Sequence, residues 1–363
     1  MAHALIVGAG LVGLLTAREL RARGFDVTVI ERGEVGREAS WAGGGILSPL
    51  YPWRFPDAVT ALTMRSLDLW PALAGTLLTR TGIDPEYRVT GLLAVNRDDP
   101  AEVTAWARRH GVDIEHLDPA VAAAQEPAAH LPAGHAFHMR AVGQVRNPRL
   151  LRAARALVVG EGVTLCPHTE VTALLSAAGR ITGVRTSAGD VAADAVVLCT
   201  GAWTAGLLDG LGATPPPIEP VRGQILAFAA TPGTMRGILL AGAHYLIPRG
   251  EGLILAGSTI ERAGFERTTT AAARAELAAF ATDLLPPLRD VEIVAHWSGL
   301  RPGTPDGVPT IDRHPSIEGL WLNAGHFRNG IVTAPASAEL AAERIAGEEP
   351  GLDPAPYAWP PEL

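Results

Sequence analysis

The stretch "ALIVGAGLVGLLTARELRARGFDVTVIER", residues 4–32, decides the fold of this chain. It reads as a short apolar strand, a glycine-rich turn, a helix that stops at Gly24, and a second strand. Two strands joined in this way by a helix lie parallel in one sheet. The chain is therefore predicted to begin with a Rossmann-type α/β domain.

The turn in this stretch matches the dinucleotide fingerprint G-x-G-x-x-G at Gly8, Gly10 and Gly13. The first glycine permits the tight turn, the second lets the backbone approach a pyrophosphate, and the third lets the helix pack closely on the strand. The helix N-terminus offers unpaired N–H groups to the phosphates. Glu31 ends the next strand 21 positions after Gly10, where an acid can accept hydrogen bonds from ribose hydroxyls. The alternative is an ordinary glycine-rich turn. The preceding strand, the following helix and the position of Glu31 together disfavour that alternative.

Two further segments favour FAD over NAD as the dinucleotide. Residues 37–49, "REASWAGGGILSP", are rich in small residues that allow a planar ring to lie against the backbone. Residues 320–335, "LWLNAGHFRNGIVTAP", read as a strand, a tight turn and the start of a helix. A helix that begins near Asn329 points its positive end at the preceding turn, which suits a flavin edge that becomes negative on reduction.

The rest of the chain alternates between α/β segments and runs of mixed β structure. We expect long helices at residues 57–81, 147–162, 269–285 and 330–345, and a single strand at residues 87–96. Two interleaved domains fit this order better than two in tandem. The predicted FAD-binding domain comprises residues 1–82, 142–219 and 298–363, and an antiparallel-sheet α+β substrate domain comprises residues 83–141 and 220–297.

Composition excludes several classes of protein. The 363 residues are 47% hydrophobic and 19% charged, which indicates a large core, and the net charge of -8 argues against a nucleic-acid partner. We see no signal peptide and no apolar run long enough to span a membrane, so a cytoplasmic protein without a membrane partner is expected. No acidic residue or cysteine lies close in sequence to His135 and His138, so no metal site is predicted.

Several motifs together resemble the D-amino acid oxidase superfamily of flavoproteins, and more narrowly the bacterial glycine oxidases of thiamine biosynthesis. The similar segments are "GAGLVGLLTAREL", "GREASWAGGGILSPLYPW", "GQVRNPRL", "EVTALL", "VLCTGAW", "VRGQIL", "HYLIPR", "GLRPGTPDGVP" and "GHFRNGIVTAP". They run from residue 8 to residue 335 in the family's order. The resemblance implies an FAD domain interleaved with a smaller antiparallel-sheet domain, and a homo-oligomer.

The resemblance also implies which residues contact the cofactor and the substrate. The implied FAD contacts are Gly8, Gly10, Leu11, Val12, Gly13, Glu31, Arg32, Ala39, Ser40, Gly44, Gly45, Ile46, Val171, Gly201, His326, Phe327, Arg328, Asn329, Gly330, Ile331 and Val332. The implied substrate contacts are Arg301 for the carboxylate, Tyr245 beside it, Arg328, and Ile260 in the pocket. The first three are the implied catalytic group.

Three departures from the family pattern concern the substrate and the flavin linkage. Ala243 stands where many glycine oxidases have a histidine, with His244 adjacent instead, and Ile260 stands where methionine is frequent. Both changes affect side-chain selectivity. The "GHFRNG" turn contains no cysteine, so a non-covalent FAD is expected.

Arg301 lies between Leu300 and a Pro-Gly pair and has no acidic partner nearby in sequence. A buried guanidinium needs an anion, and a substrate carboxylate offers one through two parallel hydrogen bonds. Together with this cation, the resemblance implies that the chain oxidises glycine, sarcosine and small D-amino acids with O2, releasing a 2-oxo acid, ammonia and hydrogen peroxide. The alternatives are a D-amino acid dehydrogenase that reduces a quinone and a non-catalytic FAD-binding subunit.

Overall fold

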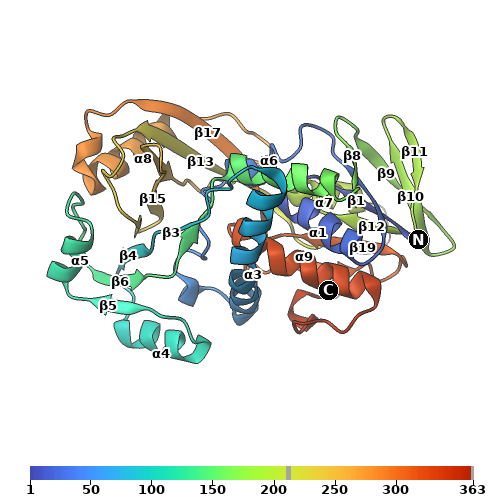
Figure 1. Ribbon diagram of the computed structural model, residues 1–363, viewed down its shortest axis with the longest axis horizontal. Helices are drawn as coiled ribbons and strands as arrows, with labels where there is room; N and C mark the ends of the chain where they lie inside the picture. The colour runs from blue at the N-terminus through green and yellow to red at the C-terminus, as the bar shows by residue number, and fades with distance from the viewer. Residues whose placement is uncertain (210–213, 361–363) are drawn as a thin grey trace.

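The computed structural model describes residues 1–209 and 214–360, and it consists of two sheets with the helices that cover them (Figure 1). The predicted domain ranges also include residues 210–213 and 361–363, which lie outside the described part. Figure 1 shows one sheet on each side of the molecule, with helix α3, Asp57–Thr81, between them.

The first sheet has six strands in the order β18-β19-β12-β1-β2-β8. All neighbours are parallel except the pair β18–β19, which is antiparallel. In chain order the strands are β1 (His3–Val7), β2 (Asp26–Ile30), β8 (Thr164–Cys166), β12 (Ala195–Leu198), β18 (Thr310–Arg313) and β19 (Leu320–Ala324). This arrangement confirms the Rossmann-type α/β fold that residues 4–32 predict.

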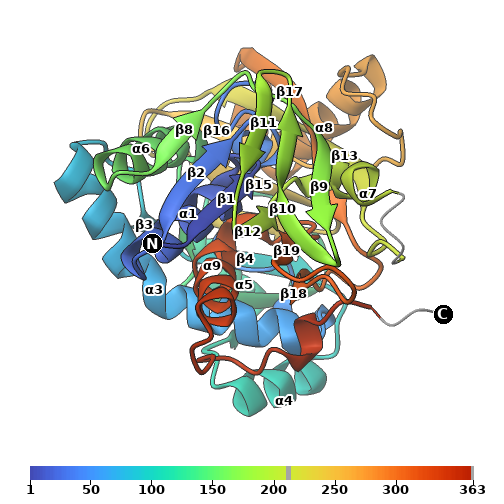
Figure 2. The same cartoon turned by 90° about the vertical axis from the view of Figure 1, so that its right-hand side faces the viewer.

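Both faces of this sheet are covered, which explains why its strands are continuously apolar. In β1, Ala4 and Ile6 face a core formed with the helices, whereas Leu5 and Val7 face a second core. The helices are α1 (Leu11–Ala22), α3, α6 (Asn147–Gly160) and α9 (Gly330–Ala346). The other face carries a three-stranded antiparallel sheet of β9 (Val171–Ala177), β10 (Arg180–Thr186) and β11 (Gly189–Ala192) (Figure 2).

The second sheet has eight strands in the order β17-β13-β16-β15-β14-β4-β6-β5. In chain order they are β4 (Leu92–Asn96), β5 (Glu115–Leu117), β6 (His135–Met139), β13 (Glu219–Ala229), β14 (Ile238–Ala241), β15 (His244–Pro248), β16 (Leu253–Gly257) and β17 (Ile293–Gly303). The sequence predicts an antiparallel sheet for this part of the chain. Every pair of neighbouring strands is antiparallel except β4 and β14, which pair in parallel. The two strands of this parallel pair are distant in the chain, since β4 ends at Asn96 and β14 begins at Ile238.

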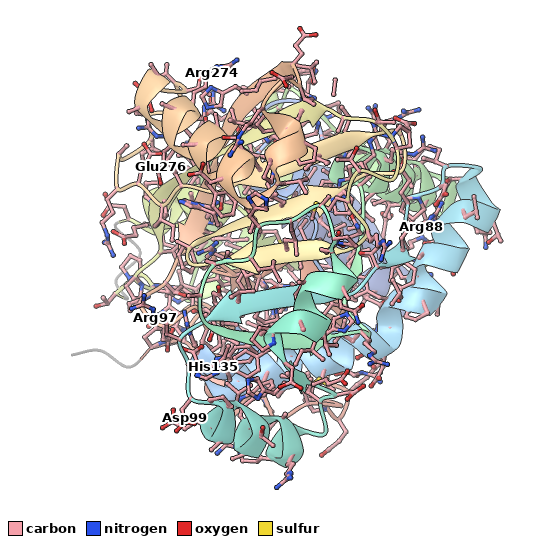
Figure 3. All side chains as sticks on the ribbon, turned by 90° about the vertical axis from the view of Figure 1, so that its left-hand side faces the viewer. Arg88, Arg97, Asp99, His135, Arg274 and Glu276 are labelled. Carbon is pink, nitrogen blue, oxygen red and sulfur yellow. The ribbon has the colours of Figure 1, made fainter. Side chains whose placement is uncertain are left out.

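Helices cover the outer face and the end of the second sheet (Figure 3). Figure 3 shows α8 (Ala271–Leu284), which carries Arg274 and Glu276, lying across the strands. Helix α4 (Pro100–His110) lies at the lower edge and begins after Asp99, whose carboxylate accepts a hydrogen bond from Ala101 N at 2.8 Å. The short helices α5 (Pro119–Gln125), α2 (Ala39–Ala42) and α7 (Thr204–Leu208) complete the fold.

The chain passes between the two sheets through a short ribbon of β3 (Arg88–Val89) and β7 (Gly143–Gln144). The strand expected at residues 87–96 is therefore divided between β3 and β4, because Gly91 has a left-handed φ of +72°. Strands β13 and β17 extend from the second sheet toward the first and cross the predicted boundaries at residues 219 and 298. The division into domains stays a prediction.

Candidate functional site

The glycine turn between β1 and α1 leaves no space for side chains at two of its positions. Gly8 has a φ of +103°, and a Cβ atom there would lie 2.6 Å from the carbonyl oxygen of Cys199. A Cβ atom on Gly13 would lie 2.0 Å from the carbonyl oxygen of Gly8. Glycine at both positions therefore lets α1 pack against the end of β1, as the fingerprint predicts.

Helix α1 presents its N-terminus to a cavity. Gly10 stands at the N-cap without a side-chain cap, and Leu11 N donates to Ser40 Oγ at 3.0 Å. The first turn of an uncapped helix carries unpaired N–H groups and a partial positive charge. Because Gly8, Gly10 and Val12 line the cavity, this charge is available to an anionic group such as a pyrophosphate.

Glu31 lies at the cavity wall beside the turn and is 9% exposed. Its carboxylate accepts hydrogen bonds from the backbone N–H groups of Ala9 and Gly33, each at 2.9 Å. These two bonds fix the orientation of the carboxylate and leave further lone pairs for a ligand hydroxyl. The neighbouring Arg32 lies 3.8 Å above the ring of Trp203, which closes the same end of the cavity.

The cavity has a volume of about 360 Å³ and lies along the carboxyl ends of β1, β2, β12 and β19. Ligands of open α/β sheets bind at this edge. The sequence-predicted residues that line it are Gly8, Gly10, Val12, Glu31, Arg32, Ala39, Ser40, Val171, Gly201, Arg301, His326, Phe327, Arg328, Gly330 and Ile331.

Other sequence-predicted residues do not line this cavity. They are Leu11, Gly13, Gly44, Gly45, Ile46, Tyr245, Ile260, Asn329 and Val332. Most of them are buried, but Ile260 is 52% exposed and its side chain lies outside this cavity. Lining residues that sequence reasoning missed include Trp203, Thr169, Glu170, Pro302 and Asn323. Trp203 lies five residues after the end of the apolar strand β12, in the segment that leaves its carboxyl end, and this position was the available signal.

The turn "GHFRNG" connects β19 to α9 and lies against the end of β17. Phe327 has a left-handed φ of +45°, and its N–H donates to Pro302 O at 2.9 Å. Asn329 N donates to His326 O at 2.9 Å, immediately before α9 begins at Gly330. Left-handed backbone in a non-glycine residue is costly and is found mainly where a site requires it. The turn therefore brings the end of β17 and the start of α9 to one wall of the cavity.

Arg301 extends from β17 into the protein interior without a carboxylate partner among the described residues. Its guanidinium donates to Thr259 O at 3.1 Å and to Ser258 Oγ at 2.8 Å, which are both uncharged acceptors. It lies directly over Gly223 of β13, where a Cβ atom would be 2.1 Å from both terminal nitrogens. Burial, and secondly the charge of Arg328, lower the pKa of Arg301 to about 10. Arg301 is still protonated at neutral pH, and no carboxylate of the described residues pairs with it directly.

Arg328 adds a second cation to the same wall. Burial lowers its pKa, and its Nη2 atom is buried without a hydrogen-bond partner among the described residues. Tyr245 lies behind this wall, 5% exposed, with its hydroxyl against Gly44 and Gly257. An unpartnered buried guanidinium beside a second one favours an anionic ligand between them.

These residues fit FAD on structural grounds. The uncapped helix and the glycine turn suit a pyrophosphate, the Glu31 carboxylate suits a ribose, and the wall at residues 326–331 borders a further part of the cavity. A group of three metal-ligating side chains is not present in residues 1–209 and 214–360. No helix in these ranges is both long and apolar enough to cross a membrane.

Comparisons with known proteins agree with this geometry. The family model "DAO: FAD dependent oxidoreductase" matches residues 3–344. The chain is 48% identical over 357 residues to the glycine oxidase of Pseudomonas putida, which covers 98% of this chain and 97% of that protein. It is 32% identical over 407 residues to the D-amino acid dehydrogenase of Methylobacterium nodulans, covering 96% of each.

A solved structure confirms the fold. The crystal structure of glycine oxidase from Geobacillus kaustophilus matches with a TM-score of 0.93 at 30% identity over 100% of both chains. The resemblance inferred from the sequence motifs is therefore confirmed. The chain belongs to the DAO family of FAD-dependent oxidoreductases and is an enzyme of that class.

Proposed function

We propose that this enzyme oxidises glycine, sarcosine and small D-amino acids to a 2-oxo acid with release of ammonia, or of methylamine from sarcosine, and of hydrogen peroxide. When bound, FAD would supply a two-electron acceptor for the hydride of the substrate α-carbon, with O2 as the final oxidant. The observation that carries the proposal is the half-buried Arg301, whose guanidinium lies at the cavity and bonds only to Thr259 O and Ser258 Oγ. A planar carboxylate is its natural partner.

The two arginines also act on the amino group of the substrate. Arg301 pairs with the carboxylate and orients the α-carbon, and Arg328 leaves a net positive charge in the site. Nearby positive charge lowers the pKa of an ammonium group, so the substrate amine is favoured in its neutral form. The nitrogen lone pair then assists departure of the hydride, and the resulting imine hydrolyses in water. No side-chain base is needed, because positioning and electrostatics carry the reaction.

The cofactor is proposed to be held without a covalent bond. The α1 N-terminus and glycine turn hold the pyrophosphate, Glu31 holds a ribose, and the turn at residues 326–331 borders the flavin. The cavity contains one thiol, that of Cys199, and burial raises its pKa to about 12. The thiol therefore stays protonated and is a poor nucleophile at neutral pH.

A second candidate is a dehydrogenase that passes electrons to a quinone, which the similarity to the D-amino acid dehydrogenase of Methylobacterium nodulans favours. Both candidates share the first half-reaction and differ in the acceptor. A non-catalytic FAD-binding subunit would not need the uncompensated charges of Arg301 and Arg328. Homo-oligomeric assembly, a cytoplasmic location and a role in thiamine biosynthesis remain parts of the proposal.

Anaerobic mixing of the FAD-loaded enzyme with a panel of amino acids tests the proposal. Bleaching of the flavin absorbance by glycine, sarcosine or small D-amino acids is expected, followed by peroxide release when air is admitted. Bleaching without peroxide, reversed by a quinone, would favour the dehydrogenase. Absence of bleaching with every amino acid would refute both. Arg301→Ala serves as the control, since it should retain FAD while the KM for glycine rises by orders of magnitude.

A further inference from the structure

A chain of four buried polar side chains leads from the cavity wall into the core. His326 Nε2 lies 2.7 Å from Ser337 Oγ, and Ser337 Oγ lies 2.6 Å from Asn323 Oδ1. Asn323 Nδ2 lies 3.1 Å from Thr16 Oγ1. All four residues are at most 3% exposed, so water does not compete for these hydrogen bonds.

The direction of every hydrogen bond in this chain follows from its far end. Thr16 donates its hydroxyl hydrogen to Val12 O at 2.8 Å, because a carbonyl oxygen can only accept. Thr16 Oγ1 must therefore accept from the amide nitrogen of Asn323. The same nitrogen lies 3.2 Å from Ser337 O, a second carbonyl, which fixes the orientation of the amide. Asn323 Oδ1 is left facing the hydroxyl of Ser337 and accepts its hydrogen.

Ser337 has then used its only hydrogen, so its oxygen accepts from His326 Nε2. The imidazole carries its proton on Nε2 and leaves a lone pair on Nδ1. Burial lowers the pKa of His326 to about 3, so the ring stays neutral at physiological pH. His326 lines the cavity, and its Nδ1 atom meets no hydrogen-bond donor among the described residues. The chain therefore presents a hydrogen-bond acceptor of fixed tautomer to whatever fills the cavity.

We propose that His326 Nδ1 accepts a hydrogen bond from an N–H or O–H group of FAD. Ser337, Asn323 and Thr16 are positioning residues that hold the ring in the required tautomer. The inference rests on FAD occupying the cavity, as the proposed function states. The competing interpretation is a purely structural histidine that serves only to satisfy Ser337 in the core.

NMR of enzyme labelled with ¹⁵N in histidine tests the tautomer directly, because the chemical shifts distinguish a protonated ring nitrogen from an unprotonated one. We expect Nε2 of His326 to be protonated and Nδ1 unprotonated, with the Nδ1 signal moving when FAD binds to the apoprotein. A protonated Nδ1, or an Nδ1 signal unaffected by FAD, would overturn the proposal.

FAD affinity, measured by titrating apoprotein variants, provides the second readout. His326→Leu should raise the Kd for FAD about 5- to 100-fold, because a donor on FAD is left without a partner. Ser337→Ala should raise the Kd for FAD about 3- to 10-fold, because it removes the hydrogen bond that keeps the proton of His326 on Nε2. His326→Asn should bind FAD more tightly than His326→Leu, because its amide oxygen can accept the hydrogen bond. Thr333→Ala is the matched control, since Thr333 is a buried residue of α9 that bonds only to Asn329 O and lies outside the cavity.

The outcomes separate this inference from the proposed function. If the natural sequence does not bind FAD at all, the proposed function fails. If it binds FAD and the His326 and Ser337 variants bind equally well, only the role of His326 is refuted. If His326→Leu does not fold, Ser337→Ala and the NMR measurement still decide the question.

Discussion

Replacing Gly223 with alanine should displace the substrate-binding guanidinium while leaving the cofactor site intact. The new Cβ atom would lie 2.1 Å from both terminal nitrogens of Arg301 and 2.2 Å from Cζ. Ordinary contact begins at 3.4 Å, so the guanidinium must move by at least about 1.3 Å. This movement breaks the bonds to Thr259 O and Ser258 Oγ, which hold the side chain in place.

The expected magnitude follows from the sensitivity of catalysis to position. A misplacement of about 1 Å costs roughly 100-fold in rate, and weaker pairing with the carboxylate adds to this loss. We therefore expect kcat/KM for glycine to fall by about 10²- to 10³-fold, through a lower kcat from misplacement and a higher KM from weaker pairing. The Kd for FAD should not change, because Gly223 does not line the cavity. Gly223 lies in strand β13 without a left-handed φ, so alanine fits the backbone there.

Steady-state kinetics and FAD titration of Gly223→Ala, Arg301→Ala, the double variant and a control check this reasoning. Gly250→Ala is the matched control, since a Cβ atom there has open space. Arg301→Ala supplies the second arm of a double-mutant cycle, in which Gly223→Ala should have almost no further effect once the guanidinium is gone. An unchanged KM in Gly223→Ala, or effects that simply add in the double variant, would refute the proposed role of Arg301.

Three more predictions concern the cofactor turn, a buried arginine and pH. Gly13→Ala should abolish FAD retention and lower Tm, because its Cβ would lie 2.0 Å from Gly8 O; purification yield of bound flavin and thermal unfolding check this. Arg249→Met should lower the free energy of unfolding in urea by roughly 1–3 kcal/mol, because Arg249 is 9% exposed and its removal leaves three buried acceptors without a donor, including Gly44 O at 2.6 Å. Burial lowers the pKa of His326 to about 3 in the folded chain, whereas a histidine in the unfolded chain has a pKa of about 6.5. Between these two pH values the unfolded chain binds one proton more than the folded chain. The contribution of His326 to stability should therefore decrease by up to about 1.4 kcal/mol per pH unit down to pH 3, and a His326→Gln variant should lack that slope in urea unfolding.

The features that sequence reasoning predicted well are those whose causes are local. Gly8, Gly13 and Glu31 act within one strand–helix–strand unit, so their spacing alone predicts the turn and the sheet edge. The helix predicted at residues 57–81 corresponds to α3, because its apolar spacing and the glycine at position 82 are read along the chain. The parallel pairing of β4 with β14 has no local signal, since it depends on where two distant segments enter the sheet.

The surroundings of Arg301 show why the rest of the site escaped prediction. The strand, the Pro-Gly pair and the lack of a nearby acid are visible in residues 295–303, and they are sufficient to identify an unusual cation. Its support comes from Gly223 in β13 and from Ser258 and Thr259 after β16, which only the antiparallel pairing of three strands brings together. The missing Cβ of Gly223 creates the space that the guanidinium fills. A sequence pattern can therefore identify the charge that binds a substrate, but its position depends on a residue that contributes no side chain at all.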